Sequence, residues 1–546
     1  MRGLLQRVLL WICVGFPLFW VLLPNGVLIV ANPSFGLHLK SLGLIASVIC
    51  MAPILLLLSR NLLHYYLWNL PFAFLSGFYA SFIYFYHDIP YDGMWFALWN
   101  TSLNTVSGVT DFFYRYIIFS VLGLIIYICC LFHPALRRWV ISKELKQKFV
   151  LLSLVFIFLT ISATNFMSKQ IPIQNFIDET IAVENYPYGM LMMLAKTRYA
   201  LYKKHPIPIT PIVRSQIPKE REIYVLVIGE AARFDYWYEV SQKMQSSLLR
   251  EPNLKIFSKA ISQANFTSLS LPLLLTGTST IDQANSHPIW PQIAKAAGCT
   301  TGWITNSTEP YDYAYDNDFY DLNMDRYAMA GLSSVVYDEV LIPEVQRAIQ
   351  QGPQKLCLVV HLIGSHFDYR ERYRSDLALF PVDKKSYRDF SSDGHDDAFV
   401  NAYKNSLIET NYVLENLIKT LKAESGIVFL LYTSDHAESF NDDNDHMYFH
   451  GNLRPKSVEF EVPFFIWAND TFKKTYPEKW QAVLDNQDRR ITNQQILPTM
   501  MDLLSIQPIP DYLPSSLLQF YDHHVKRYVL LPQMELMNFR QLKHSS

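Results

Sequence analysis

Cysteine is scarce in this chain, which has six cysteines among its 546 residues. Four of them lie in apolar stretches of the first third, where they are small apolar fillers: Cys13, Cys50, Cys129 and Cys130. Only Cys299 and Cys357 remain for the rest of the chain. This scarcity argues against a disulfide-dense fold and against a cysteine-rich zinc site. A single disulfide between Cys299 and Cys357 stays open, because the sequence does not supply the required geometry.

Runs of basic residues are also missing from the sequence. The chain carries 47 lysines and arginines against 49 aspartates and glutamates, a formal net charge of -2. Nucleic-acid-binding domains usually concentrate positive charge on one surface, so no nucleic-acid partner is expected. There is no internal repeat and no low-complexity tract, and no segment predicts an obligate protein partner.

Five long apolar stretches occupy the first third of the chain. They run from Val8 to Ala31, Leu39 to Leu58, Leu67 to Tyr86, Tyr116 to Phe132 and Phe149 to Phe166. These lengths approach the roughly 20 residues that a helix needs to cross a bilayer core. The first stretch is too long for a signal peptide, and four more follow it. Buried helices of a soluble core are a much weaker explanation. The pattern predicts a transmembrane domain of five helices over residues 1–168.

Basic residues in the short loops give the orientation of these helices. They gather before the first span, after the second, and between the fourth and fifth: Arg2, Arg7, Arg60, Arg137, Arg138, Lys143, Lys146 and Lys148. The loop between the third and fourth spans is acidic instead, and Lys40 is a minor exception. We therefore expect a multi-pass protein with a cytoplasmic amino terminus. In a bacterium with two membranes, the chain would lie in the inner membrane and its second part in the periplasm.

A second domain is expected after a connector that covers residues 169–220. Within this connector, Tyr186 to Leu194 fits either an amphipathic helix at the membrane interface or a helix packed on the globular domain. Four prolines then predict a stiff, extended stretch. Over residues 221–546, apolar strand-like runs alternate with helical patterns such as Ala402 to Ala423. This alternation predicts an α/β domain with a mostly parallel central sheet and helices on both faces.

Polar residues with metal-binding side chains stand where several apolar runs end. Asp435 and His436 follow the run from Ile427 to Tyr432, and Glu230 follows the run from Tyr224 to Ile228. Similarly, the run from Leu356 to Val360 leads into His361 and then His366, and His450 and Gly451 precede the run from Val462 to Trp467. Open α/β sheets place their sites at the carboxyl ends of strands. Together these strand ends predict a metal-dependent active site.

The segment from Asn265 to Pro272 is rich in serine and threonine and leads into an apolar helix. A Ser, Thr or Asn at such a place is ordinarily a helix N-cap. On local grounds, this explanation of Thr267 weighs as much as a catalytic one.

Five motifs in one order, preceded by the apolar spans, decide between these explanations. They are Glu-Ala-Ala-Arg at 230–233, Thr-Ser-Leu-Ser-Leu-Pro at 267–272, His-Leu-Ile-Gly-Ser-His at 361–366, Asp-His-Ala-Glu-Ser at 435–439 and His-Gly at 450–451. In this order they resemble the bacterial phosphoethanolamine transferases of the alkaline phosphatase/sulfatase superfamily. The resemblance extends over essentially the whole chain.

The resemblance implies roles for individual residues. Glu230, Thr267, Asp435 and His436 would bind one catalytic zinc tightly, and Thr267 would also be the covalent nucleophile. The side-chain types suit this role, since carboxylate and imidazole are ordinary zinc ligands and bound zinc activates a hydroxyl.

Further residues match the family less directly. His366 and His450 match histidines near the donor phosphate, with roles in phosphate binding, leaving-group protonation or a second, weaker zinc. Asn100 and Thr105 match part of a set that contacts the donor headgroup. By contrast, His361 is expected to be structural and His446, in an acidic loop, to be solvated.

The implied reaction takes phosphoethanolamine from phosphatidylethanolamine and transfers it, through a covalent threonine intermediate, to an envelope glycan. The acceptor would be lipopolysaccharide, at a core sugar or lipid A, or another glycan. Three departures from the lipid A-modifying members favour a core sugar or another glycan: Leu273 to Thr276 replaces a Cys-Met-Phe-Ser segment, Asn306 to Pro310 lacks a lysine, and Val109 replaces a glutamate. Ala231 replaces the Thr or Ser that usually follows Glu230, a position that is not the nucleophile.

Two rival functions remain at this stage. One is a related membrane-anchored enzyme that moves another phosphoryl headgroup, such as glycerol phosphate, or a plain phosphatase. The other is a catalytically silent envelope scaffold. Sulfatase activity is disfavoured, because there is no Cys/Ser-x-Pro-x-Arg segment for a modified nucleophile.

Overall fold

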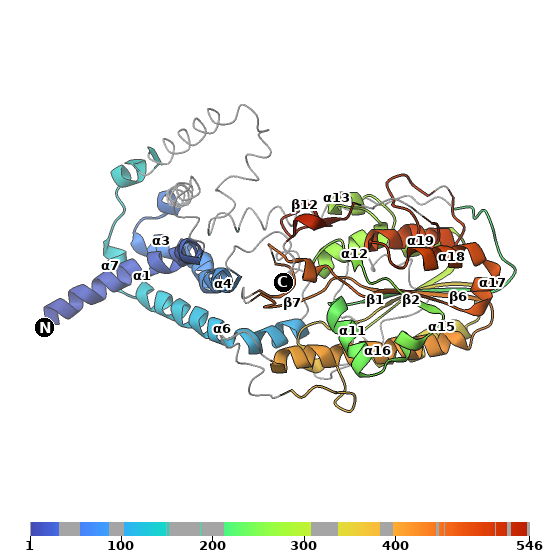
Figure 1. The fold of residues 1–546 in the computed structure, drawn as a ribbon. Helices are drawn as coiled ribbons and strands as arrows, with labels where there is room; N and C mark the ends of the chain where they lie inside the picture. The colour runs from blue at the N-terminus through green and yellow to red at the C-terminus, as the bar shows by residue number, and fades with distance from the viewer. Residues whose placement is uncertain are drawn as a thin grey trace. The chain divides into compact units, whose positions relative to one another are not determined.

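The computed structural model describes two compact units of the chain. Its described residues are 2–31, 55–86, 103–148, 150–151, 186, 190, 212–306, 337–382, 397–443, 447–452, 454–507, 509–520 and 526–542. The first unit comprises Met1–Trp95 with Thr110–Tyr202, and the second comprises Phe96–Val109 with Lys203–Ser546 (Figure 1).

Helices make up the described part of the first third. They are α1 (Arg2–Ala31), α3 (Leu62–Trp68), α4 (Leu70–Tyr86), α6 (Leu103–Leu131) and α7 (Pro134–Arg138). The indole nitrogen of Trp20 on α1 donates to the carbonyl of Ala73 on α4, at 2.9 Å. A Cβ at Gly123 of α6 would lie 1.9 Å from the Trp20 ring. Glycine at that position therefore lets α1 and α6 pack closely.

The predicted membrane spans are found in part. Among the residues that the structure describes, one helical segment, Leu10–Leu28, is long and apolar enough to cross a membrane. The second and fifth predicted spans lie largely outside the described residues. The fourth matches the apolar segment Arg115–Leu131 of α6. This helix begins earlier, at Leu103, in turns that are helical but too polar to register as an apolar run.

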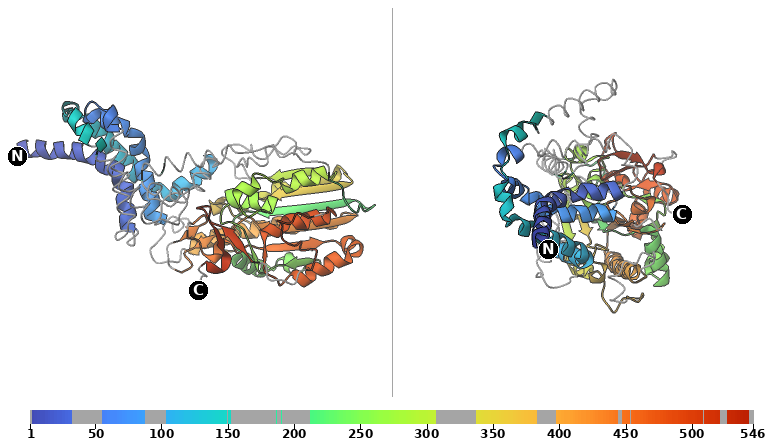
Figure 2. Two further views of the ribbon diagram at one scale, coloured as in Figure 1. Left: turned by 90° about the horizontal axis from the view of Figure 1, so that it is seen from above. Right: turned by 90° about the vertical axis from the view of Figure 1, so that its left-hand side faces the viewer.

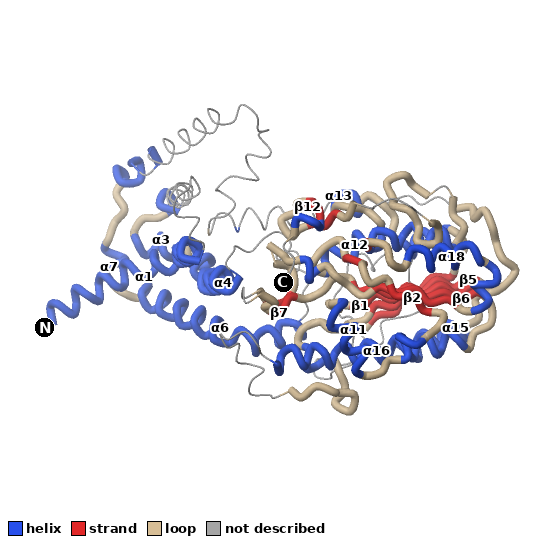
Figure 3. Tube along the Cα trace, in the orientation of Figure 1, coloured by secondary structure: helices blue, strands red, loops and turns tan. Residues whose placement is uncertain are grey.

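A six-stranded sheet forms the centre of the second unit, in the order β2-β9-β6-β1-β5-β4 (Figure 3). Its strands are β1 (Glu222–Gly229), β2 (Leu254–Ile256), β4 (Thr300–Thr305), β5 (Lys355–His361), β6 (Ile427–Ser434) and β9 (Phe464–Ala468). Strands β4, β5, β1 and β6 run parallel, whereas β9 is antiparallel to both β6 and β2. The predicted mostly parallel sheet is confirmed, with an antiparallel pair at one edge.

Helices cover both faces of this sheet, as predicted (Figures 1 and 2). One layer contains α12 (Thr267–Thr276), α18 (Pro477–Asn486) and α19 (Ile496–Leu503), and the other contains α11 (Phe234–Lys243), α15 (Leu341–Gln350) and α16 (Asp397–Lys422). Helix α14 (Trp290–Ala296) packs beside α19.

Three small sheets and one further helix complete the described elements that matter below. The sheets pair β3 (Ala260–Ile261) with β10 (Ile491–Thr492), β7 (Ser439–Phe440) with β8 (Tyr448–Phe449), and β11 (Tyr528–Leu530) with β12 (Leu536–Asn538). Helix α17 spans Asp470–Thr475.

The two central strands explain where the polar residues gather. Every residue of β1 and β6 is buried, as expected for parallel strands covered on both faces. Gly229 pairs with Ser434 in register, and the backbone N–H of Asp435 donates to the carbonyl of Gly229 at 3.0 Å. Glu230 and Asp435 therefore lie side by side, each directly after the carboxyl end of one of two neighbouring strands.

The chain joins this unit before the predicted start at residue 221. The Ile212 N–H donates to the Ala296 carbonyl at 3.0 Å. Arg214 binds both carboxylate oxygens of Glu222, at 2.7 and 2.6 Å, and both side chains are 1% exposed. Arg214 also donates to the Leu504 carbonyl at 2.7 Å. These contacts attach the residues just before β1 to α14, β1 and α19.

Candidate active site

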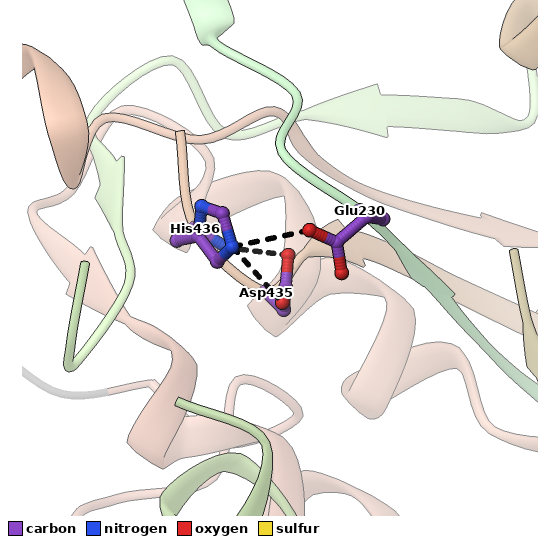
Figure 4. A group of neighbouring side chains, drawn as sticks. All are labelled: Glu230, Asp435 and His436. Carbon is purple, nitrogen blue, oxygen red and sulfur yellow. Dashed lines mark hydrogen bonds and ion pairs between the residues drawn. The ribbon is translucent and has the colours of Figure 1, made fainter. Parts of the chain in front are cut away.

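Three buried side chains meet at the carboxyl ends of β1 and β6. Ligand atoms of Glu230, Asp435 and His436 all lie within 4.8 Å of one another (Figure 4). His436 Nε2 is 3.1 Å from Glu230 Oε1 and 3.5 Å from Asp435 Oδ2. Two carboxylates and one imidazole suit a divalent metal ion such as zinc. This group could therefore hold a metal.

The backbone orients two of these side chains for such a role. Asp435 Oδ1 accepts N–H groups from His436 at 2.7 Å and Ala231 at 3.2 Å, whereas its Oδ2 has no hydrogen-bond partner within the described part of the chain. An unsatisfied, fully buried carboxylate oxygen is costly without a cation. His436 Nδ1 lies 3.1 Å from the Ala437 carbonyl, which favours a proton on Nδ1 and leaves Nε2 as the ligand atom. The residues present thus fit a bound metal.

Thr267 completes this group from the layer of helices. Its Oγ1 is 3.1 Å from Glu230 Oε2 and 3.1 Å from His436 Nε2. Thr267 is the first residue of α12, the N-cap is Phe266, and no side chain caps this helix. The N-cap explanation of Thr267 is therefore wrong. Its hydroxyl lies at the positive end of the helix dipole, which favours an anion there.

His450 lies directly beside the metal-binding group. Its ring centroid is 4.2 Å from that of His436. Its Nδ1 is 3.0 Å from Oε1 of Glu438, whose side chain is fully buried, whereas the His450 side chain is 25% exposed. The carboxylate therefore orients the ring and leaves Nε2 for proton transfer or ligand binding.

His366 belongs to a turn that packs on Glu230. The Ser365 N–H donates to the Glu230 carbonyl at 3.0 Å, and His366 Nδ1 lies 2.8 Å from the Phe367 carbonyl. At Gly364, where φ is +46°, a Cβ would come within 2.8 Å of the Glu230 carbonyl oxygen. Only glycine fits this close approach without moving Glu230.

A buried aspartate holds the same turn in place. Asp338 accepts N–H groups from Ile363 at 3.0 Å and Gly364 at 2.8 Å, and the amide of Asn306 at 3.3 Å. Burial raises the pKa of Asp338, although these three donors oppose the shift. The turn beneath Glu230 is thereby fixed by hydrogen bonds from three chain segments.

Glu459 connects the nucleophile segment to the His450 segment. It accepts the side-chain amides of Asn265 at 2.8 Å and Asn452 at 2.9 Å, and its own carbonyl accepts the Ala437 N–H at 2.9 Å. The Gly451 N–H also donates to the Asn265 carbonyl at 2.9 Å. Burial raises the pKa of Glu459 to about 8. Thr267, His436 and His450 therefore sit on segments that are hydrogen-bonded to one buried residue, Glu459, through its carboxyl group or its backbone carbonyl.

The remaining predicted residues lie elsewhere or outside the described residues. His361 is buried at the end of β5 and packs edge-on against Trp303, 6.0 Å between ring centroids, as expected of a structural histidine. Asn100 and His446 lie outside the described residues, as does the side chain of Thr105. Cys299 and Cys357 are buried free thiols, and a hydrogen bond from Cys357 lowers the pKa of Cys299.

Glu438 and Glu459 were not predicted from the sequence as site residues. Glu438 stands inside the Asp-His-Ala-Glu-Ser motif, and this was the available signal for it. Glu459 carries no such signal, because its partners are brought together only by the fold.

Known proteins resemble this chain in sequence and in fold. The family model described as Sulfatase matches residues 222–506. The phosphoethanolamine transferase EptC of Escherichia coli O18:K1:H7 is 24% identical over 324 residues, which are 56% of this chain and 55% of that protein. The chain thus spans about half the length of this relative. Its resemblance to phosphoethanolamine transferases is confirmed.

Two solved structures share the fold. The C-terminal periplasmic domain of Escherichia coli EptC, in complex with Zn, matches with a TM-score of 0.52 and 22% identity, covering 62% of this chain and 98% of that domain. The integral membrane protein lipooligosaccharide phosphoethanolamine transferase A (EptA) of Neisseria meningitidis matches with a TM-score of 0.62 and 17% identity, covering 82% of this chain and 88% of that one.

Proposed function

Because this chain belongs to the sulfatase family, whose model matches residues 222–506, we propose that it is a zinc-dependent phosphoethanolamine transferase. The donor is phosphatidylethanolamine. The acceptor is lipopolysaccharide, at a core sugar or lipid A, or another envelope glycan. The names of its relatives support this choice, since one is called a phosphoethanolamine transferase and another acts on lipooligosaccharide.

One observation carries the proposal. The Thr267 hydroxyl lies 3.1 Å from Glu230 Oε2 and 3.1 Å from His436 Nε2, at the amino end of a helix. A buried threonine in such surroundings has partners that can accept its proton and a local positive potential for an incoming phosphate. A scaffold protein has no need for this arrangement.

The resident metal in this proposal is a tightly bound zinc held by Glu230, Thr267, Asp435 and His436. When bound, zinc lowers the pKa of a ligated hydroxyl and neutralises charge on phosphoryl oxygens. A second, weaker zinc during catalysis would use His366 and His450.

The proposed reaction consists of two displacements at phosphorus. Thr267 Oγ1 gives up its proton and forms a bond to the donor phosphorus, while the bond to the diacylglycerol oxygen breaks and that oxygen takes a proton. His450 is placed to supply the proton because Glu438 orients its ring through Nδ1 at 3.0 Å beside the metal-binding group. In the second half, an acceptor hydroxyl or phosphate oxygen forms a bond to the same phosphorus and displaces Thr267 Oγ1, which regains a proton.

The proposal also assigns the first third of the chain to the membrane. Five helices over residues 1–168 would anchor the protein in the bacterial inner membrane. Residues 169–220 would connect them to a periplasmic catalytic domain over residues 221–546, and the end of this connector, from Ile212 on, already packs on that domain. Asn100 and Thr105 would contact the donor headgroup. Because the donor and the proposed acceptor are lipid-anchored, an anchored enzyme meets both in one thin layer, which raises their effective concentration.

One experiment tests the proposal directly. The full chain, reconstituted in nanodiscs with headgroup-labelled phosphatidylethanolamine, should release diacylglycerol. The peptide that contains Thr267 should gain the mass of one phosphoethanolamine group. A gain of a glycerol phosphate group from phosphatidylglycerol would identify the rival transferase, and release of free phosphoethanolamine with no acceptor product would identify a hydrolase. No adduct and no diacylglycerol with zinc bound would contradict the proposal.

A further inference from the structure

Four cationic side chains gather on one surface of the second unit, from separate chain segments. They are Lys259 before β3, Arg490 before β10, Arg527 before β11 and Arg540 after β12. Arg527 Nη1 donates to the Lys259 carbonyl at 2.9 Å, and the Ile491 N–H donates to the same carbonyl at 3.3 Å. Arg490 and Arg540 both act electrostatically on Arg527.

These cations are not held in close ion pairs within the described residues, although Glu461 acts electrostatically on Arg527. None of the four forms an ion pair within the described part of the chain, and the neighbouring carboxylates Glu461, Asp488 and Glu535 form none with them either. Lys259 Nζ donates to a backbone carbonyl, that of Asp488, at 3.0 Å. Burial and the charges of Arg490 and Arg540 lower the pKa of Arg527 to about 10, whereas Glu461 opposes this shift. Clustered like charges that a nearby carboxylate compensates only in part favour an external anion.

The β11–β12 hairpin beside these cations has one buried face, and exposed apolar side chains lie on part of the other face. Val529 and Met537 form a pair directed toward a small core that includes Ile261 and Phe460. On the opposite face, Tyr528 and Leu536 are each 42% exposed, and Met534 in the turn is 37% exposed. An aromatic ring and aliphatic side chains beside unpaired cations form the combination that lets a protein surface enter a lipid headgroup region.

The hairpin lies close to the catalytic segments. The Leu530 N–H donates to the Gln263 carbonyl at 2.7 Å, and Leu530 forms a bridge with Ala264, three residues before Thr267. Ser262 Oγ in turn contacts the Asp435 carbonyl. The cationic surface is therefore on the part of the domain that carries the active site, whereas α17 lies at the far end of the sheet (Figure 1).

We propose that Lys259, Arg490, Arg527 and Arg540, with the exposed face of the β11–β12 hairpin, form a docking surface for an anionic lipid bilayer. The cations bind lipid phosphates while Tyr528, Met534 and Leu536 enter the headgroup layer. Docking of this kind presents the Thr267 segment to membrane-embedded substrates. The inference goes beyond the proposed function, and it requires a membrane but no particular reaction.

Hydrogen exchange of the full chain in nanodiscs tests this proposal. Backbone amides of residues 526–542 should exchange more slowly in discs that contain phosphatidylglycerol than in discs of phosphatidylcholine alone. The surface substitutions Arg490→Gln and Arg540→Gln should each weaken docking roughly fivefold, and high salt should weaken it further. Lys474→Gln, an exposed cation on α17, is the matched control and should change nothing. Unchanged melting temperatures would show that the variants fold.

The outcomes separate this inference from the proposed function. Thr267→Ala should show the same lipid-dependent protection as the parent chain, because docking precedes chemistry. Equal exchange in both kinds of disc would overturn the proposal, as would an effect of Lys474→Gln as large as that of Arg490→Gln. Protection by inorganic phosphate in phosphatidylcholine discs, equal to that by phosphatidylglycerol, would replace the docking surface with a soluble-anion site.

Discussion

The ring of His450 lies beside the ring of His436, with 4.2 Å between the two centroids. One histidine belongs to the candidate metal-binding group, and the other is held by the buried carboxylate of Glu438 at 3.0 Å. Under the proposed function, this arrangement would separate a residue that binds a metal from a residue that transfers protons, although the two are neighbours in space.

The first prediction concerns this separation. His450→Gln should lower kcat for transfer roughly a hundredfold, in the range of a lost general acid, while zinc content stays unchanged. Glu438→Gln should lower kcat less, because the amide can still hydrogen-bond to His450 Nδ1 but orients the ring less firmly than the carboxylate does. Metal analysis and pH-dependent kinetics check both results. Loss of zinc in the His450 variant would make this histidine a ligand of the resident metal.

The second prediction concerns the nucleophile. Thr267→Ala should reduce transfer by roughly a thousandfold or more, because the reaction loses its covalent step. Stability should change little, since Thr267 does not cap α12. Diacylglycerol release and thermal unfolding of the same preparation measure the two effects. Ser268→Ala, one residue further along α12, is the matched control, and retained turnover in Thr267→Ala would refute the assignment.

The third prediction concerns the metal. Alanine at Glu230, Asp435 or His436 should remove most of the bound zinc, because each supplies one ligand atom to a compact group. His361→Gln should leave zinc in place, since His361 packs against Trp303 instead. Elemental analysis after dialysis against a weak chelator decides the matter. Full zinc content in the Asp435 and His436 variants would place the metal elsewhere.

The fourth prediction is a pH dependence of stability from Glu459. Its pKa is raised from 4.5 to about 8 in the folded state, so the folded chain holds a proton that the unfolded chain releases. The contribution of Glu459 to stability is therefore fully present below pH 4.5 and is lost as the pH rises toward about 8. Glu459→Gln should lack this component.

The glutamine side chain of this variant should be accommodated in place of Glu459. Asn265 Oδ1 has no hydrogen-bond partner among the residues described, so the Asn265 side chain can turn to accept a hydrogen bond from the introduced amide. Thermal unfolding of both chains across this pH range gives the comparison. Parallel pH profiles for the two chains would rule out the raised pKa.

The fifth prediction concerns where the catalytic domain can be cut. A chain that begins at Pro218 lacks Arg214 and leaves the carboxylate of Glu222 buried without its cationic partner, with the Tyr224 hydroxyl as its remaining side-chain donor. It should be about 3–5 kcal/mol less stable than a chain that begins at Lys203. In the chain that begins at Lys203, Arg214→Met alone should cause a similar loss of stability. Adding Glu222→Leu to Arg214→Met should recover much of it, because no buried charge is then left without a partner. Urea unfolding measures all of these differences, and equal stability of the two truncated chains would show that the ion pair contributes little.

The residues that the sequence could predict share a local signal. Asp435 and His436 come after the apolar run from Ile427 to Tyr432. Such a run indicates a buried strand of a parallel sheet, and binding sites in these sheets lie at the carboxyl ends of the strands. Thr267 was ambiguous because a threonine before an apolar helix has a local explanation as good as the catalytic one. The ordered motifs decided this case, and the helix start at Thr267 agrees with them.

The roles that the sequence missed depend on contacts across distant segments. Glu459 joins Asn265 and Asn452 although 194 residues separate it from Asn265. Arg214 was assigned to a stiff, extended connector, since proline spacing says nothing about a partner eight residues away across a turn. Likewise, the polar first turns of α6 hide a helix from any hydropathy profile. The contacts of Glu459 and Arg214 form only once the chain has folded, so the sequence carries no local signal for them.

Helix α12 has a consequence for the handedness of the reaction. All ten of its residues are buried, so its first residue, Thr267, presents Oγ1 to substrate from one side only. Each in-line displacement inverts the configuration at phosphorus. If donor and acceptor both react through this single oxygen, two inversions follow one another. The product phosphodiester then retains the configuration that the donor had at phosphorus. A donor made chiral at phosphorus by oxygen isotopes would show this retention.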